Sequence, residues 1–203
     1  MVEYWNSLLT EKSFELLQNL KKVSFEFILI GGWAAYLWTG LHKSKDIDIV
    51  VDINNLDFIK KNYNLIKNDN LKKYEIKIEE IDIDIYVPYY SKLGIPVKDI
   101  KKFSCKLKGF NVVIPEVLLI LKQDAELDRK DSVKGEKDRI DILTLLICCD
   151  IDFKKYNELL KKYDIKKFRS RLKQIVSSFK ELKYIGLNLR EYKLKKLEIL
   201  EKL

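Results

Sequence analysis

Residues 27–52 read FILIGGWAAYLWTGLHKSKDIDIVVD, and the rest of the chain is best interpreted outward from them. An apolar, β-branched run is stopped by Gly31 and Gly32, which is typical of a buried strand that ends in a turn. Residues 33–41 return to helical spacing, and residues 46–52 have the composition of a second strand. Glycines let a backbone approach a phosphate closely, and a helix N-terminus offers free N–H groups to an anion. The stretch therefore predicts a strand, a turn suited to an anion, a helix and a second strand.

The remaining elements follow the same periodicities. The expected strands are residues 25–30, 73–79 and 81–87, with a hairpin over 106–114. The expected helices are residues 3–21 (with Trp5 on the apolar face), 54–67, 116–129 and 136–149, followed by two or three more in the tail. Strands come first and helices alone follow, which predicts an α+β core with a C-terminal helical extension. We expect a boundary near Pro115, with a catalytic core over 1–114 and a helical domain with a basic tail over 115–203.

Paired carboxylates mark the second strand of the opening stretch. Side chains alternate along a strand, so Asp46 and Asp48 share one face while Ile47 and Ile49 face the core. Two carboxylates about 7 Å apart on one face repel each other unless a cation lies between them. Hard divalent ions such as Mg²⁺ prefer these oxygen ligands. The other interpretation is the solvated face of an edge strand.

A second run, Ile81-Asp82-Ile83-Asp84-Ile85, repeats this alternation. If the two strands are neighbours, a third carboxylate joins the first pair. Both Asp82 and Asp84 have the same facing, and Asp84 is preferred because it lies deeper in the strand.

This order of features resembles the signature of the DNA polymerase β-like nucleotidyltransferase superfamily. The run from Gly31 to Asp48 looks closest to the small prokaryotic branch that includes AbiEii-type toxins, minimal nucleotidyltransferases and antibiotic nucleotidyltransferases. The resemblance, which covers about residues 24–148, implies a mixed sheet of the polymerase β palm type flanked by helices. It also implies a metal-dependent enzyme that transfers a nucleoside monophosphate from a nucleoside triphosphate, such as ATP, to a hydroxyl group.

The resemblance implies roles for particular residues. Asp46, Asp48 and Asp84 would be catalytic and would hold two Mg²⁺ or Mn²⁺ ions, and Asp84 could accept the proton of the attacking hydroxyl. The nucleotide would contact residues from the turn, the following loop and two later helices, namely Gly31, Gly32, Ser44, Lys45, Lys122, Lys137 and Asp138. For the helical residues, a surface cluster of ion pairs that includes Asp141 is the alternative. The sequence departs from many relatives at Gly32, where they carry Ser, and at His42, where they carry Arg, so Lys43 or Lys45 would replace that arginine.

Charge is concentrated at the C-terminal end. The chain has a formal net charge of +8, and residues 150–203 carry sixteen Lys and Arg against eight Asp and Glu. Such a tail favours a polyanionic partner, RNA or DNA first, over an acidic membrane surface, although a solvated basic face explains it equally well. Aromatic residues between the lysines suit base stacking, but at helical spacing they are more often core.

Several alternatives remain open at this point. The acceptor could be a tRNA-like RNA, as for an AbiEii-type toxin, or a partner protein in a toxin–antitoxin pair that is modified with AMP. A small molecule such as an antibiotic, and a nucleotide-binding pseudoenzyme, are also compatible. No apolar run is long enough to cross a bilayer, and the N-terminus lacks a signal-peptide pattern, so we expect a cytoplasmic protein without a membrane partner. The adjacent Cys148 and Cys149 are expected in the core.

Overall fold

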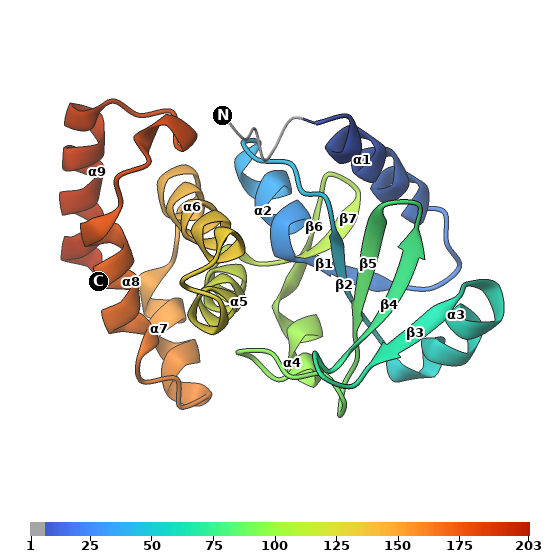
Figure 1. Cartoon of the computed structure of the whole chain (residues 1–203). Coiled ribbons are helices and arrows are strands. Elements are labelled where there is room, and N and C mark those ends of the chain that lie inside the picture. Colours follow the sequence, from blue (N-terminus) through green and yellow to red (C-terminus); the bar gives the residue numbers. More distant parts are fainter. Residues whose placement is uncertain (1–6) are drawn as a thin grey trace. The chain divides into compact units, whose positions relative to one another are not determined.

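The computed structural model describes residues 7–203. The chain divides into two compact units, Met1–Ile114 and Pro115–Leu203, and each is a separate body of structure (Figure 1). Within the described residues, no helix is both long and apolar enough to cross a membrane.

The first unit is built on a seven-stranded mixed sheet in the order β3-β4-β5-β2-β1-β7-β6. Two neighbouring pairs, β2 with β5 and β1 with β7, are parallel, and the other pairs are antiparallel. The strands are β1 (Phe27–Ile30), β2 (Ile47–Val51), β3 (Leu65–Asn68), β4 (Lys73–Ile78), β5 (Ile81–Tyr86), β6 (Ser104–Leu107) and β7 (Phe110–Val113). The central strands β2 and β5 alternate as predicted, because their isoleucines are buried while their aspartates lie on the other face.

In the described part of this unit, four helices and two 3₁₀ turns accompany the sheet. They are α1 (Leu8–Leu20), α2 (Gly31–Thr39), η1 (Ile53–Asn55), α3 (Leu56–Asn62), α4 (Val97–Ile100) and η2 (Lys101–Phe103). Helix α1 begins at Ser7, whose hydroxyl accepts a hydrogen bond from the backbone N–H of Thr10. Helix α2 packs against β1 and β2, and it carries the fully buried Trp33, which stacks on Phe14 and donates a hydrogen bond to Ser13 Oγ at 3.0 Å.

The second unit contains helices only. They are α5 (Pro115–Asp128), α6 (Val133–Cys148), α7 (Phe153–Lys162), α8 (Phe168–Ser178), η3 (Leu182–Tyr184) and α9 (Leu189–Lys202). A buried polar chain ties three of them together, since Tyr156 Oη donates to Gln123 Oε1 at 2.6 Å and Gln123 Nε2 donates to the carbonyl of Phe168 at 2.8 Å. Tyr156, Phe168 and Tyr192 are buried, so these tail aromatics serve the core and are not available for stacking on bases.

The predicted fold class, an α+β mixed sheet flanked by helices, is confirmed. The helix predicted over 54–67 is wrong in its second half, because the chain becomes extended at Tyr63 and Leu65–Asn68 pairs with β4 as an edge strand. Pairing with a neighbouring strand outweighs local helical spacing there. The first residues of the helix predicted over 3–21, with Trp5, lie outside the described part. The prediction that both cysteines are core is also wrong, since Cys148 is exposed and Cys149 partly so.

Candidate active site

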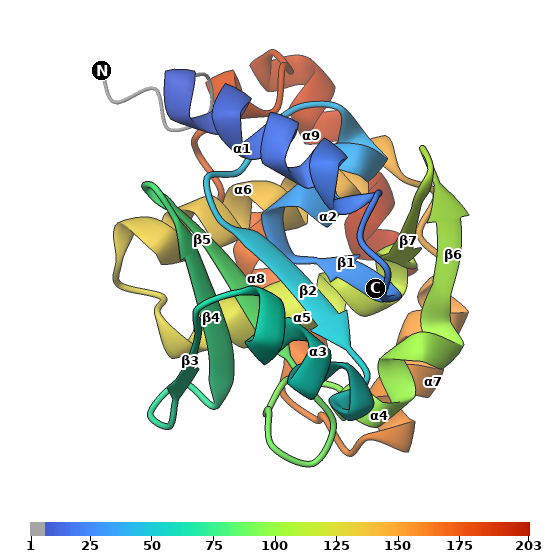
Figure 2. The same cartoon turned by 90° about the vertical axis from the view of Figure 1, so that its right-hand side faces the viewer.

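The sheet brings the two aspartate-bearing strands side by side. Strands β2 and β5 are parallel neighbours (Figure 2), and Asp48 lies directly opposite Asp84 in their register. Asp46 comes directly before β2 and, two residues from Asp48, has the same facing. Asp48 and Asp84 thus lie opposite each other on one face of the sheet centre, with Asp46 two residues before Asp48.

The pKa of Asp84 is perturbed by its surroundings. Burial and the nearby charge of Asp48 raise the pKa of Asp84 to about 7, against the lowering effect of Lys73. Its Oδ1 atom is buried and has no hydrogen-bond partner. A buried carboxylate oxygen without a partner is costly, and a cation bound there would remove that cost.

The backbone conformation at position 31 and the close approach of Asp48 both require a glycine there. Its φ of +67° lies in the left-handed region, which glycine adopts without strain. A Cβ atom at this position would lie 2.1 Å from Asp48 Oδ2. The glycine turn therefore fits directly against Asp48, and it opens α2, whose N-terminus has no side-chain cap. Its first N–H groups are consequently suited to a phosphate.

Lys73 and Glu75 of β4 belong to this site, although neither was predicted from the sequence. Lys73 Nζ lies 2.6 Å from Asp84 Oδ2 and 3.0 Å from Glu75 Oε1. Burial lowers the pKa of Lys73, but Asp84 and Glu75 outweigh it, and the net shift is upward. The available signal was the alternation in the predicted strand 73–79, which places residues 73 and 75 on one face.

The donor set fits hard divalent cations. Within residues 7–203, no three His, Cys, Asp or Glu side chains form a completed metal-binding cluster, and Lys73 is the cation that Asp84 contacts. The fit lies in the chemistry of the groups. Carboxylate oxygens from Asp46, Asp48 and Asp84 are the ligands that Mg²⁺ and Mn²⁺ prefer, and Asp84 Oδ1 is buried without a partner.

The geometry distinguishes Asp84 from Asp82. Asp84 is buried and opposite Asp48, whereas Asp82 is only partly buried and lies opposite Lys77 of β4. The electrostatic coupling of Asp84 to Asp48 and Asp46 agrees with this difference. These observations support Asp84 as the third carboxylate.

The loop before β2 holds the other predicted phosphate contacts. Ser44 is buried and Lys45 is exposed. Lys43 forms an ion pair with Glu11 of α1 and lies 5.7 Å from the centre of the Phe14 ring. Of the two lysines considered as substitutes for the arginine of relatives, Lys45 is therefore the better placed for a ligand.

The remaining predicted nucleotide contacts lie in the second unit. Lys122 is buried on α5, and its Nζ lies 3.2 Å from Asp138 Oδ1 and 2.6 Å from Asp141 Oδ2 on α6. Burial raises the pKa of Asp138, but Lys122 and Arg129 outweigh it and hold the value below its ordinary range. Lys137, on the same helix, is half-buried. The geometry shows Lys122 and Asp138 as parts of a buried ion-pair cluster.

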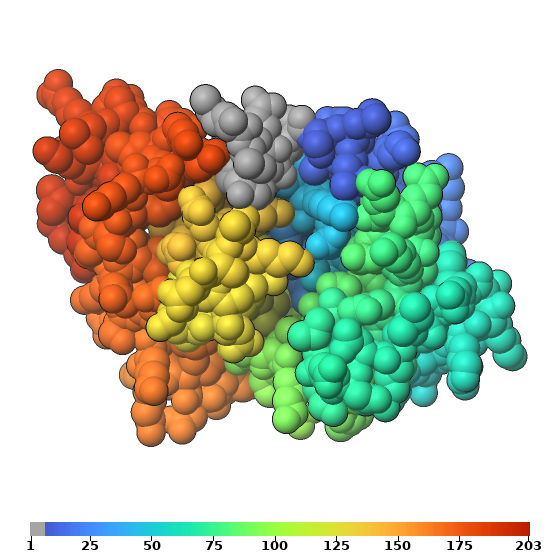
Figure 3. Space-filling view, viewed as in Figure 1, coloured from blue at the N-terminus to red at the C-terminus, as the bar shows by residue number. Residues whose placement is uncertain are grey.

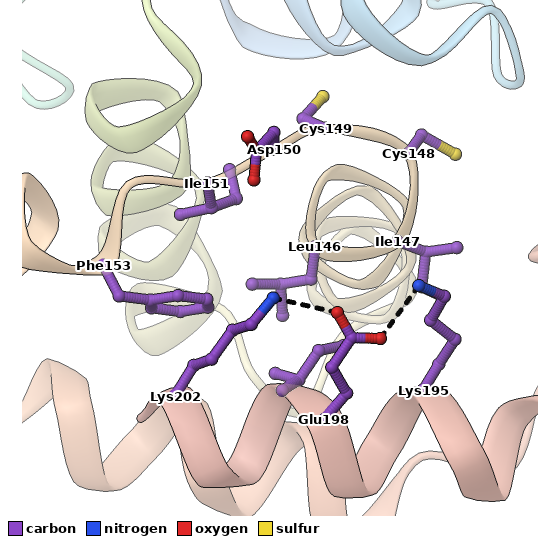
Figure 4. Close-up of a pocket in the computed structure, with 11 residues that line it drawn as sticks. Leu146, Ile147, Cys148, Cys149, Asp150, Ile151, Phe153, Lys195, Glu198 and Lys202 are labelled. Carbon is purple, nitrogen blue, oxygen red and sulfur yellow. Dashed lines mark hydrogen bonds and ion pairs between the residues drawn. The ribbon is translucent and has the colours of Figure 1, made fainter.

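A pocket in the second unit lies where the end of α6 meets α9 (Figure 4). Two lysines of the basic tail, Lys195 and Lys202, flank Glu198 there and pair with it at 2.9 and 2.8 Å. Cys148 and Cys149 line its rim, and burial raises the pKa of the Cys149 thiol to about 12. Burial thus disfavours the thiolate form of Cys149, which is the nucleophile and the metal ligand.

Comparisons with known proteins support the fold. No protein-family model matches the sequence, and the search of curated proteins found no match. Among solved structures, ANT(2")-Ia in complex with adenylyl-2"-tobramycin is similar with a TM-score of 0.52 and 14% identity, over 81% of this chain and 99% of that one. JHP933 from Helicobacter pylori is similar with a TM-score of 0.49 and 20% identity, over 96% and 91% of the two chains. A putative nucleotidyltransferase from H. pylori gives a TM-score of 0.48 and 20% identity, over 97% and 95%.

The similarity to ANT(2")-Ia places the chain in a structural class. Its sheet and helices have the fold of nucleotidyltransferase-like proteins. The similarity concerns the fold, and the AbiEii-type branch in particular stays a prediction.

The contact between Gly31 and Asp48 gives a direct test of the site. Gly31→Ala is expected to lower the activity of this site by about 100-fold, because the new methyl group displaces the Asp48 carboxylate. Gly40→Ala is the matched control. Gly40 also has a positive φ, of +74°, but nothing lies within 4 Å of its Cβ position. Steady-state kinetics measures the activity of both variants, and urea unfolding measures the strain that they share. An equal loss of activity in the two variants would contradict this assignment.

Proposed function

We propose that this protein is a metal-dependent nucleotidyltransferase that transfers a nucleoside monophosphate from a nucleoside triphosphate to a hydroxyl group on RNA. The observation that carries the reaction type is the carboxylate set of Asp46, Asp48 and Asp84 beside the Gly31 turn. Paired acidic residues next to an anion-binding turn are the parts that phosphoryl chemistry requires.

Different residues of the chain have different roles in the proposed reaction. Gly31, Gly32 and the N-terminus of α2, with Ser44 and Lys45, bind and orient the triphosphate. Asp46, Asp48 and Asp84 would hold two divalent ions, which would supply Lewis-acid stabilisation of the charge that develops on the phosphoryl group. Lys122, Lys137 and Asp138 stay proposed nucleotide contacts. Lys122 and Asp138 belong to the buried ion-pair cluster, and stabilising that cluster is their alternative role.

The basic tail supports RNA as the acceptor. Lysines on α7, α8 and the segment between them are exposed, among them Lys161, Lys167 and Lys173. Exposed lysines bind phosphate backbones without sequence preference. Since three of the tail aromatics are buried and the others only partly exposed, recognition would rest mainly on backbone charge. As an AbiEii-like enzyme, the protein would act on tRNA-like molecules.

One observation favours a small-molecule acceptor as the second candidate. The similar structure of ANT(2")-Ia was determined with adenylyl-2"-tobramycin, an adenylylated small molecule. Transfer of AMP to a partner toxin or antitoxin protein, and nucleotide binding without catalysis, are further outcomes of the experiment below.

The acceptor is tested by incubating the protein with Mg²⁺ or Mn²⁺ and each α-labelled nucleoside triphosphate, in the presence of total RNA, tobramycin or lysate protein. We expect label in RNA. Replacing Lys161, Lys167 and Lys173 together by Glu should weaken RNA binding and reduce the slope of log affinity against log salt by about one unit for each phosphate that the protein no longer neutralises. Lys195→Glu and Lys202→Glu, at lysines already paired with Glu198, are the matched controls. Label on tobramycin or on protein would reject RNA as the acceptor, and nucleotide binding without any labelled product would reject catalysis.

A further inference from the structure

A fourth carboxylate extends the acidic row across the sheet. In the antiparallel register of β4 and β5, Glu75 lies directly opposite Asp84, just as Asp48 lies opposite Asp84 on the other side. Three strands therefore place carboxylates at one level and on one face, in the order Asp48, Asp84, Glu75. Directly opposed like charges destabilise a sheet, so this row requires counter-ions.

Lys73 forms ion pairs with two carboxylates of this row. It comes two residues before Glu75 on β4, which gives it the same facing, and only 13% of its side chain is exposed. Its ammonium group reaches Asp84 Oδ2 at 2.6 Å and Glu75 Oε1 at 3.0 Å. Glu75 is held from the opposite side by Asn68 Nδ2 at 3.1 Å. The lysine can therefore lose one anionic partner and keep the other. The segment that holds α3, β3 and the β3–β4 turn lies at the surface of the molecule (Figure 3).

We propose that Lys73 and Glu75 act as a counter-ion exchange pair that sets the affinity of the carboxylate site for its divalent cation. Lys73 neutralises Asp84 in the absence of the cation, and it pairs with Glu75 alone when the cation binds Asp84. This inference rests on the proposed function, because the cation belongs to that reaction. Lys73 and Glu75 are positioning residues in this scheme, and neither one contacts the substrate.

The physical reason is competition for one carboxylate. A divalent cation and an ammonium group repel each other when both contact Asp84. If Lys73 had no second partner, its displacement would leave a buried charge unpaired, and that cost would weaken cation binding. Glu75 removes this cost, so the two residues should affect cation affinity in opposite directions.

The test is the direct binding of Mn²⁺ to the full chain without nucleotide, followed by electron paramagnetic resonance of the free ion. Partners of metal ligands typically change metal affinity by about 10–100-fold. We expect Lys73→Met to tighten Mn²⁺ binding by about tenfold and Glu75→Gln to weaken it by about tenfold. The double variant should bind Mn²⁺ as tightly as Lys73→Met does. Without Lys73, no ammonium group competes with the cation for Asp84, so Glu75 has no lysine to pair with.

Matched controls separate this effect from net charge and from damage to the fold. Lys77→Met removes a charge from the same face of β4, at an exposed position opposite Asp82. Glu79→Gln removes a carboxylate from the exposed turn after β4. Both should leave Mn²⁺ affinity within about twofold of wild type, since exposed charges are strongly screened, and circular dichroism should show native folding in every variant.

Opposite shifts in the two single variants would support the exchange pair. Weakened binding in both, or no change in either, would overturn it, because a purely structural role cannot tighten binding in Lys73→Met. Failure of the proposed function has a different signature. In that case any Mn²⁺ binding to the wild-type protein would be unchanged in Asp48→Asn. The proposals of the exchange pair and of the cation site would then both be wrong.

Discussion

Asp48→Asn and Asp84→Asn should each reduce nucleotidyl transfer by at least about 1,000-fold, equivalent to ~4 kcal/mol of transition-state stabilisation. The substituted amide keeps the size of the side chain but removes the negative charge that attracts a divalent cation. Because Asp48 and Asp84 lie opposite each other on β2 and β5, loss of either one breaks the set. The measurement is the steady-state kcat/KM with labelled nucleoside triphosphate at saturating Mg²⁺.

Asp82→Asn is the control for that experiment. Asp82 shares the strand and the facing of Asp84 but lies opposite Lys77 and is only partly buried, so its loss should change kcat/KM by less than about fivefold. Unfolding in urea should show that Asp84→Asn is no less stable than wild type, because it removes a charge from an acidic row. If Asp82→Asn were the inactive variant, the third carboxylate would be Asp82 and the assignment of Asp84 would be wrong.

Lys122→Met should destabilise the protein by about 3–5 kcal/mol, because it leaves Asp138 and Asp141 buried beside each other with less compensating charge. Lys122 is 6% exposed and Asp138 and Asp141 are 1% exposed, so water cannot replace the missing ammonium group. Urea unfolding at neutral pH, followed by the circular dichroism of the helices, measures this change.

Two further variants separate burial from charge. Lys202→Met removes an exposed lysine that pairs with Glu198 at a similar distance, and it should leave stability unchanged within error. The double variant Lys122→Met/Asp141→Asn should recover part of the lost stability, since it removes the charge of Asp141, which has lost Lys122, while Asp138 keeps its ion pair with Arg129. No recovery would indicate that Lys122 acts through its packing and not through its charge.

Much of the first unit could be predicted from its sequence, because the governing rules are local. The alternation around Asp46 and Asp48 and around Asp84 identified two strands and the facing of their carboxylates. The resemblance implied a third aspartate on a later strand, and the sheet order makes that strand a neighbour of β2.

What the sequence could not provide depends on pairing between distant residues. Strand β3 forms because Leu65–Asn68 meets β4, and no periodicity in residues 54–67 indicates that partner. Lys73 joins the site only through the register that sets Glu75 opposite Asp84. The burial of Tyr156 and Lys122 likewise follows from helix packing in the second unit, which spacing alone does not specify.

The ion pair between Lys73 and Asp84 has a consequence for the order in which the chain folds. Strands β4 and β5 form a hairpin joined by a short turn at Glu79 and Glu80, a local contact that closes quickly. Strands β2 and β5 are distant in sequence, so their pairing has a larger entropic cost and comes later. We therefore expect Asp84 to reach β2 already neutralised by its own hairpin, which lets two acidic strands associate in a nascent sheet that their charges would otherwise keep apart.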